Sequence, residues 1–215
     1  MDVLINNSDL FVIGFRNTLV LFVFSAIFAL ILGTIVGAMR VSPVGPMRMV
    51  GTAYVNLVRN TPLTLLMFFF AFGYPKLGLP SIDYLQLAIV ALSLYTATYV
   101  AETVRAGVNT VPVGQAEAAR ALGLPFTKTM SLVVLPQAFR AVIPPMMSVF
   151  IALLKNTTIA AGFSVQEAGA IRAYASERGE PALVVLLWVA LIFVILVWLL
   201  ALLQRYLEKK WSLTR

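Results

Sequence analysis

Charged side chains inside apolar stretches are the first candidates for chemistry in this chain. Arg59 follows ten uncharged residues that begin at Met49, and sixteen more follow it up to Pro75. Glu102 also lies in a mostly apolar stretch, nearer to its end. An ionised group at membrane depth is costly to desolvate, so it usually faces a partner or a water-filled cavity. Arg59 and Glu102 could therefore contribute to a path for a polar solute, or they could pair or snorkel and simply hold helices together.

The residue types that most catalytic and metal chemistry needs are absent from the sequence. There is no cysteine and no histidine, which excludes thiolate nucleophiles, disulfides, imidazole metal ligands and histidine acid–base catalysis. A membrane-embedded enzyme would need another clustered catalytic set, and Glu102 is the one carboxylate that we place close to membrane depth. We therefore expect no enzymatic activity, no metal site and no cofactor in this chain.

The composition indicates an integral membrane protein. Hydrophobic residues make up 60% and charged residues 12% of the chain, against about 45–50% and about 25% in soluble domains. Two charge-free runs, Asn17 to Met39 and Pro181 to Gln204, exceed the roughly 20 residues that a transmembrane helix needs. The net charge of +7 would suit nucleic acid only on the basic face of a soluble fold. Because the cations lie mostly between apolar spans, we expect lipid and no nucleic acid as a partner.

An all-α fold with five transmembrane helices follows from these runs. The predicted spans cover about residues 18–39, 47–74, 84–108, 130–154 and 182–204 of a single domain, 1–215, and Arg59 interrupts the second. Gly33 and Gly37 form a small-xxx-small step in the first span, which is typical of close helix packing. In the fourth span, Pro136, Pro144 and Pro145 indicate either breaks in the helix, with the freed backbone groups facing protein or a cavity, or a kinked helix that only packs.

The distribution of Lys and Arg predicts the orientation. With a cytoplasmic C-terminus, the inner segments hold nine of these residues and the outer segments five, in agreement with the positive-inside rule. An odd number of spans then puts the N-terminus outside. The inner set is Arg40, Arg48, Arg105, Arg120, Lys128, Arg205, Lys209, Lys210 and Arg215, and the outer set is Arg16, Lys76, Lys155, Arg172 and Arg178.

The predicted inner loop, residues 109–129, contains a short helix. Residues 115–122 are rich in alanine and favour a helix, Gly123 stands where a left-handed residue would end it, and Pro125 prevents its continuation. A helix of about two turns is marginal alone in water, so it must dock on something. Ala118, Ala119 and Leu122 share a small, smooth face at helical spacing. On composition alone, an ordinary loop lying on the membrane surface fits equally well.

The motifs in and around this loop resemble one family. Glu117-Ala118-Ala119, Gly123, Val133 and Leu135-Pro136 are spaced as in the EAA loop of binding-protein-dependent ABC importer permeases, although that family has Ile where this chain has Val133. The surrounding motifs resemble the polar amino-acid branch, and the chain as a whole resembles glutamate-type permeases of high-GC Gram-positive bacteria. These motifs are Arg59-Asn60-Thr61-Pro62, Tyr99-Val100-Ala101-Glu102 with Arg105 and Gly107, Gly114-Gln115, Leu135-Pro136-Gln137-Ala138 and Leu154-Lys155-Asn156-Thr157-Thr158.

The resemblance implies a type I importer (MetI-like) permease fold in a bacterial plasma membrane, with a coupling helix seated in a separate ATPase subunit. The implied partners are two ABC ATPase subunits, a second permease subunit that is a homologue or an identical copy, and an extracytoplasmic amino-acid-binding protein. No Gly-x-x-x-x-Gly-Lys-Ser/Thr phosphate loop occurs here, so ATP and its magnesium would be bound by the partner ATPase. The implied coupling residues are Gly114, Gln115, Ala116, Glu117, Ala118, Ala119, Arg120, Ala121, Leu122 and Gly123.

The resemblance also implies that the second to fourth spans line a central substrate path. The candidate path residues are Arg59, Asn60, Thr61, Glu102, Lys155 and Asn156. We expect a polar amino acid as the substrate, with glutamate first and glutamine or arginine as alternatives. A secondary transporter would also place ionisable groups in its spans, but it would not need the Glu-Ala-Ala loop and would work without ATP.

Overall fold

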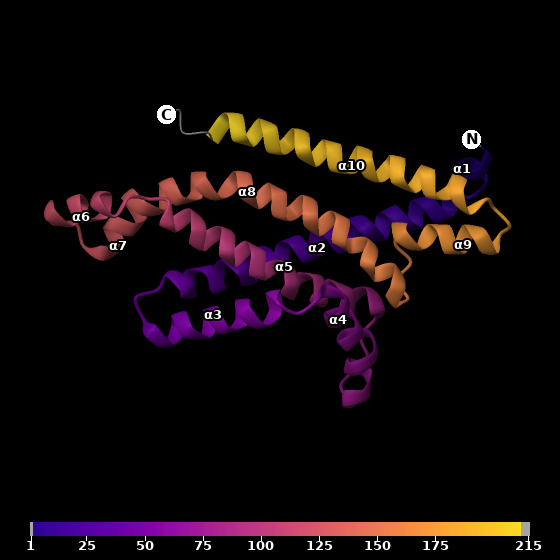
Figure 1. Ribbon diagram of the computed structural model, residues 1–215, viewed down its shortest axis with the longest axis horizontal. Coiled ribbons are helices and arrows are strands. Elements are labelled where there is room, and N and C mark those ends of the chain that lie inside the picture. The colour runs from indigo at the N-terminus through magenta and orange to yellow at the C-terminus, as the bar shows by residue number, and fades with distance from the viewer. Residues whose placement is uncertain (1, 212–215) are drawn as a thin grey trace.

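The computed structural model describes residues 2–211, and all regular secondary structure in this part of the chain is helical (Figure 1). Four helices of this described part are long and apolar enough to cross a membrane: α2, α5, α10 and the run from Phe126 to Phe163 that contains α8. The α-helices are α1 (Asp2–Asn6), α2 (Ser8–Val41), α3 (Gly45–Arg59), α4 (Leu63–Phe68), α5 (Tyr84–Asn109), α6 (Val113–Ala121), α7 (Phe126–Thr129), α8 (Leu135–Asn156), α9 (Ile171–Glu177) and α10 (Ala182–Trp211). The π and 3-10 segments are η1 (Phe69–Gly73), η2 (Tyr74–Leu77), η3 (Met130–Val134), η4 (Thr157–Phe163) and η5 (Ala168–Ala170).

The fifth candidate span is a bent pair of segments. The helix Gly45–Arg59 and the segment Leu63–Leu77 meet at an angle of 92°. The bend follows directly after Arg59, because Pro62 lacks an N–H and disfavours helical geometry at the residue before it. The predicted second span is therefore sharply bent, and α4 with the turns after it projects from the side of the bundle (Figure 1).

The helices α2 and α5 pack closely along a row of glycines on α2. A Cβ added at Gly33 would lie 2.5 Å from the Cβ of Val100, and one added at Gly37 would lie 2.9 Å from the Cβ of Val104. Real Cβ atoms do not approach so closely, so α2 and α5 can be this near only because both positions are glycine. The interpretation of the Gly33–Gly37 step as a packing feature agrees with this contact.

Of the two alternatives for the fourth span, a break at Pro144 and Pro145 is contradicted. Pro144 and Pro145 lie inside α8, which continues through both of them to Asn156. Pro136 lies in the first turn of α8, where a missing N–H is tolerated, and the irregular stretch is instead the π-helical η3 just before it. Neighbouring helices hold the rest of α8 in place, as membrane helices with proline allow.

The two ends of the bundle carry different elements. The short helices α6 and α7 lie at the end toward which α10 runs, and α1 and α9 lie at the opposite end (Figure 1). At that opposite end, Arg178 donates two hydrogen bonds to Asp9, of 2.9 and 2.7 Å. Within α10 only Val185 and Val189 are buried, so most of this apolar helix faces outward. Arg215 of the charge pattern lies outside the described residues.

Candidate functional site

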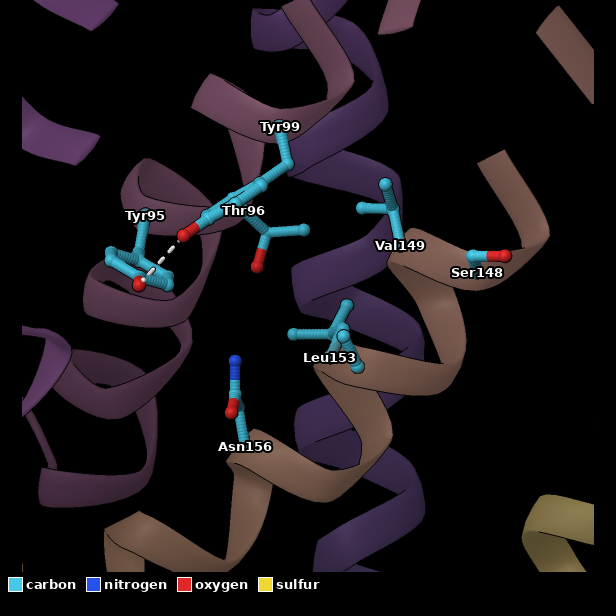
Figure 2. A pocket seen from close by; sticks show the side chains of 8 residues that line it. Tyr95, Thr96, Tyr99, Ser148, Val149, Leu153 and Asn156 are labelled. Atoms are coloured by element: carbon cyan, nitrogen blue, oxygen red, sulfur yellow. Dashed lines mark hydrogen bonds between the residues drawn. The ribbon is translucent and has the colours of Figure 1, made fainter. Parts of the chain in front are cut away.

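A cavity of about 430 Å³ lies between α5 and α8. Figure 2 shows Tyr95 and Tyr99 on α5 directed toward each other, and Asn156 at the end of α8 directed into the space between the two helices. The wall is polar at several points and apolar elsewhere. The lining residues are Tyr95, Thr96, Tyr99, Ser148, Val149, Ala152, Leu153 and Asn156.

The polar groups of the cavity can bind a small zwitterion through hydrogen bonds and charge. The hydroxyls of Tyr95 and Tyr99 share a hydrogen bond of 2.9 Å, and each hydroxyl can both donate and accept. The guanidinium carbon of Arg59 lies 5.2 Å from the centroid of the Tyr99 ring, which is within the range of a cation–π interaction. Within residues 2–211, no carboxylate lines the cavity. A cation beside a wall without acids favours a ligand that carries carboxylates.

The structure brings together two of the six candidate path residues. Asn156 lines the cavity and Arg59 stacks on one of its walls. Asn60 ends α3, and Thr61 donates its hydroxyl to the carbonyl of Leu57 at 2.8 Å. Lys155 is exposed at the end of α8. The residues Asn60, Thr61 and Lys155 are not among those that line this cavity.

Glu102 is engaged by arginines instead. One of its carboxylate oxygens accepts from Arg40 at 2.5 Å, and the other accepts from Arg105. Glu102 does not line the cavity. This arrangement favours the alternative that Glu102 is a pairing residue of the helix bundle.

Sequence reasoning missed the tyrosines and Ser148. Tyr95 and Tyr99 are four residues apart, so they lie on one face of α5, and that spacing is a readable signal. Ser148 sits in an apolar helix without a charge nearby in the sequence. Only the approach of α8 to α5 identifies it as a cavity residue.

The short helix of the 109–129 loop is present as α6. The predicted span, 115–122, overlaps its observed extent, Val113–Ala121. Gly123 has φ +84°, its N–H donates to Arg120 at 2.9 Å, and the N–H of Leu124 donates to Ala119 at 3.1 Å. These two bonds form a Schellman motif. The left-handed helix end that the sequence indicated is therefore observed.

The predicted docking face of α6 needs one correction. Ala119 is buried at 6% exposure, because α6 lies against η3 and α7 of the same chain. Ala118 is exposed, and Leu122 is exposed at 84%. The free surface of α6 is thus formed without Ala119.

One side-chain contact ties α6 to the start of α8. The amide nitrogen of Gln137 donates to Gln115 at 2.5 Å and to the carbonyl of Val133 at 2.7 Å. Since α6 also follows α5 after only residues 110–112, it is connected to both helices that form the cavity. A displacement of α6 would therefore be transmitted to both α5 and α8, the two walls of the cavity.

Comparisons with known proteins agree with this arrangement. Residues 29–213 match the family described as binding-protein-dependent transport system inner membrane component. The glutamate transport system permease protein GluC of Corynebacterium glutamicum is 51% identical over 166 residues, covering 72% of this chain and 73% of that protein. The probable glutamine ABC transporter permease protein GlnM of Bacillus subtilis is 36% identical over 214 residues, covering 98% and 97%.

Two solved structures share the fold. The crystal structure of an amino acid ABC transporter with histidines matches with a TM-score of 0.91 and 25% identity over 96% of each chain. An inward-facing conformation of the MetNI methionine ABC transporter matches with a TM-score of 0.81 and 26% identity over 98% of this chain and 99% of that one. This chain therefore belongs to the family of inner membrane components of binding-protein-dependent transport systems, as a multi-pass permease with the MetI-like fold of type I ABC importers.

Proposed function

We propose that this chain is the glutamate permease subunit of a binding-protein-dependent ABC importer. It forms the translocation path together with a second permease subunit, identical or homologous. Two separate ABC ATPase subunits bind ATP and magnesium, and an extracytoplasmic binding protein delivers the amino acid. In this proposal the end of the bundle that carries α6 is cytoplasmic, and the N-terminus is outside.

The observation that carries the coupling role is the shape of α6. It has nine residues, which is too few for a helix to be stable alone, and its Schellman end gives it a defined length. It lies at one end of the bundle (Figure 1) and exposes Leu122 at 84%. A short helix with a defined C-terminal end and an exposed apolar side chain beside that end suits the transmission of rigid-body movement from a partner subunit.

The proposed substrate rests on the cavity and on the relatives. Glutamate has two carboxylates and one ammonium group, and the cavity offers hydroxyls, the Asn156 amide and the nearby Arg59 without any acid in its wall. Burying a carboxylate requires hydrogen-bond donors or a cation. The relative that is 51% identical is a glutamate permease protein by name. Asn60, Thr61 and Lys155 remain proposed path residues for another state of the transport cycle.

The experiment that tests this function uses the whole complex. The permease is purified with its ATPase and binding protein, placed in lipid vesicles, and ATP hydrolysis is measured with glutamate, glutamine or arginine. We expect glutamate to stimulate hydrolysis and to be accumulated only with ATP. Preferential stimulation by glutamine or arginine would contradict the substrate, and accumulation without ATP would indicate a secondary transporter.

A further inference from the structure

A charged cluster at the α6 end of the bundle joins α2 to α5, and α3 packs against it. Glu102 of α5 accepts hydrogen bonds from Arg40, at the end of α2, and from Arg105, one turn further along α5. Glu102 lies about two turns before the end of α5. Gly51 of α3 covers the cluster, since a Cβ there would lie 3.0 Å from Cγ of Arg40. The cluster thus sits where α2, α3 and α5 meet.

The bond between Arg40 and Glu102 is the central one. The Arg40 side chain is only 10% exposed, and Glu102 is the carboxylate that it contacts. The Nε of Arg40 has no hydrogen-bond partner within the described residues. Without Glu102, a buried guanidinium would keep its charge but lose its counter-ion, which is strongly unfavourable. Arg105, at 37% exposure, can instead turn to water.

An apolar cluster continues the same junction. Val36 of α2, Val55 of α3 and Ala101 of α5 are buried against one another, and Gly37 lies against Val104 one turn further along. The close α2–α5 contact therefore holds the helices together along their length, and the Arg40–Glu102 bond holds them at the end. The helices α2, α3 and α5 form one body at this end.

The chain leaves this body directly into α6. The hydroxyl of Thr110 donates to Gly107 at 2.7 Å, and the N–H of Val111 donates to Val108 at 3.3 Å. These bonds continue the turn at the end of α5, so the connection between α5 and α6 has little freedom to extend. Along the chain, Glu102 is closer to α6 than the cavity residues Tyr99 and Tyr95 are, so a displacement of α6 is transmitted to Glu102 first.

We propose that Glu102 is a positioning residue for energy coupling: through Arg40 it makes α2 and α3 move with α5 when α6 is displaced. This inference rests on the proposed function of α6 as the coupling helix. Without the bond, a displacement of α6 would shift the end of α5 relative to α2 and α3. ATP would then be hydrolysed without a matching movement of the cavity walls.

The test compares glutamate uptake with ATP hydrolysis in the reconstituted complex. For Glu102→Gln, which has the same size but no charge, we expect uptake per ATP hydrolysed to fall about tenfold, within the usual range for coupling between linked sites. The triple variant Arg40→Glu, Glu102→Arg and Arg105→Gln restores opposite charges between positions 40 and 102, leaves no second arginine beside position 102, and should recover the ratio. Asp9→Asn is the matched control, because it removes an exposed carboxylate–arginine pair at the other end and should leave the ratio unchanged.

The outcomes separate coupling from mere stability. An unchanged ratio in Glu102→Gln, a proportional loss of both uptake and hydrolysis, or no recovery in the charge swap would overturn the proposal. If Glu102→Gln does not assemble with the ATPase, Glu102→Asp keeps the charge but shortens its reach, and a smaller fall in the ratio is expected. If another amino acid stimulates the wild-type complex, the glutamate assignment fails while the ratio for that amino acid still tests the bond.

Discussion

Gly123, the left-handed residue after α6, offers the sharpest test of the proposal that α6 is a coupling helix. Its φ is +84°, and a Cβ at this position would meet no heavy atom within 4 Å. A Gly123→Val substitution therefore causes backbone strain without a clash. The left-handed conformation costs an L-residue roughly 1–2 kcal/mol, and 1.4 kcal/mol is about a tenfold change in an equilibrium. We expect the defined end of α6 to be lost in most molecules and uptake to fall about tenfold.

Gly179 provides a control with the same geometry. It also has φ +84° and open space around it, and its N–H and that of Glu180 donate to Ser176 and Ala175 in the same Schellman pattern. Gly179→Val thus introduces the same strain between α9 and α10, at the other end of the bundle. Both variants should melt at a lower temperature, by about 2–4 °C per kcal/mol for a chain of this size.

The assay is ATP-dependent glutamate uptake at matched amounts of membrane protein, together with co-purification of the ATPase. Only the Gly123 variant should lose uptake and ATPase binding. Equal uptake by the two variants would refute the reasoning, because it would mean that the defined end of α6 has no role in coupling.

Three further outcomes follow from other contacts. Arg59→Ala should lower glutamate-stimulated ATP hydrolysis several-fold, since the cation at the cavity is lost, and normal stimulation would make Arg59 purely structural. Gly33→Ala should lower the melting temperature, because its Cβ would overlap Val100 at a cost of roughly 1–3 kcal/mol, whereas Gly45→Ala, with open space around it, should not. Burial raises the pKa of Glu167 to about 7 from 4.5, so the folded protein binds this proton more tightly than the unfolded chain. Stability should therefore fall as the pH rises from 4.5 to about 7, and Glu167→Gln should flatten that dependence in a melting series.

Local features of the chain were readable before any tertiary structure. The end of α6 follows from Gly123 and Pro125, because a left-handed residue and a missing N–H act on their own backbone. The close α2–α5 contact follows from Gly33 and Gly37, since only small residues let two helices approach. The bend after Arg59 was not predicted, although Pro62 disfavours helical geometry at the residue before it.

Non-local features were mispredicted or missed for one common reason. Ala119 was expected on the docking face, but η3 folds back against it. A break of the fourth span at Pro144 and Pro145 was one of two alternatives, and the sequence could not decide against it, because the packed surroundings of α8 carry the helix through both prolines. Glu102 was left open between a path role and a pairing role, and its pairing with Arg40 joins positions 62 residues apart, so no local pattern names the partner.

The sequence by itself determined a membrane-embedded helical permease, the position of the short helix between its third and fourth spans and the absence of thiol and imidazole chemistry, because composition, helix ends and motif spacing are local properties of the chain. Only the tertiary structure decided which polar side chains share a cavity and which charges neutralise each other. Arg59 stacks on Tyr99 and Asn156 faces the same space, while Glu102 is held by arginines. The reason is physical: the cost of a charge in a membrane demands a partner, but helix packing alone determines whether that partner is another side chain or the wall of a cavity.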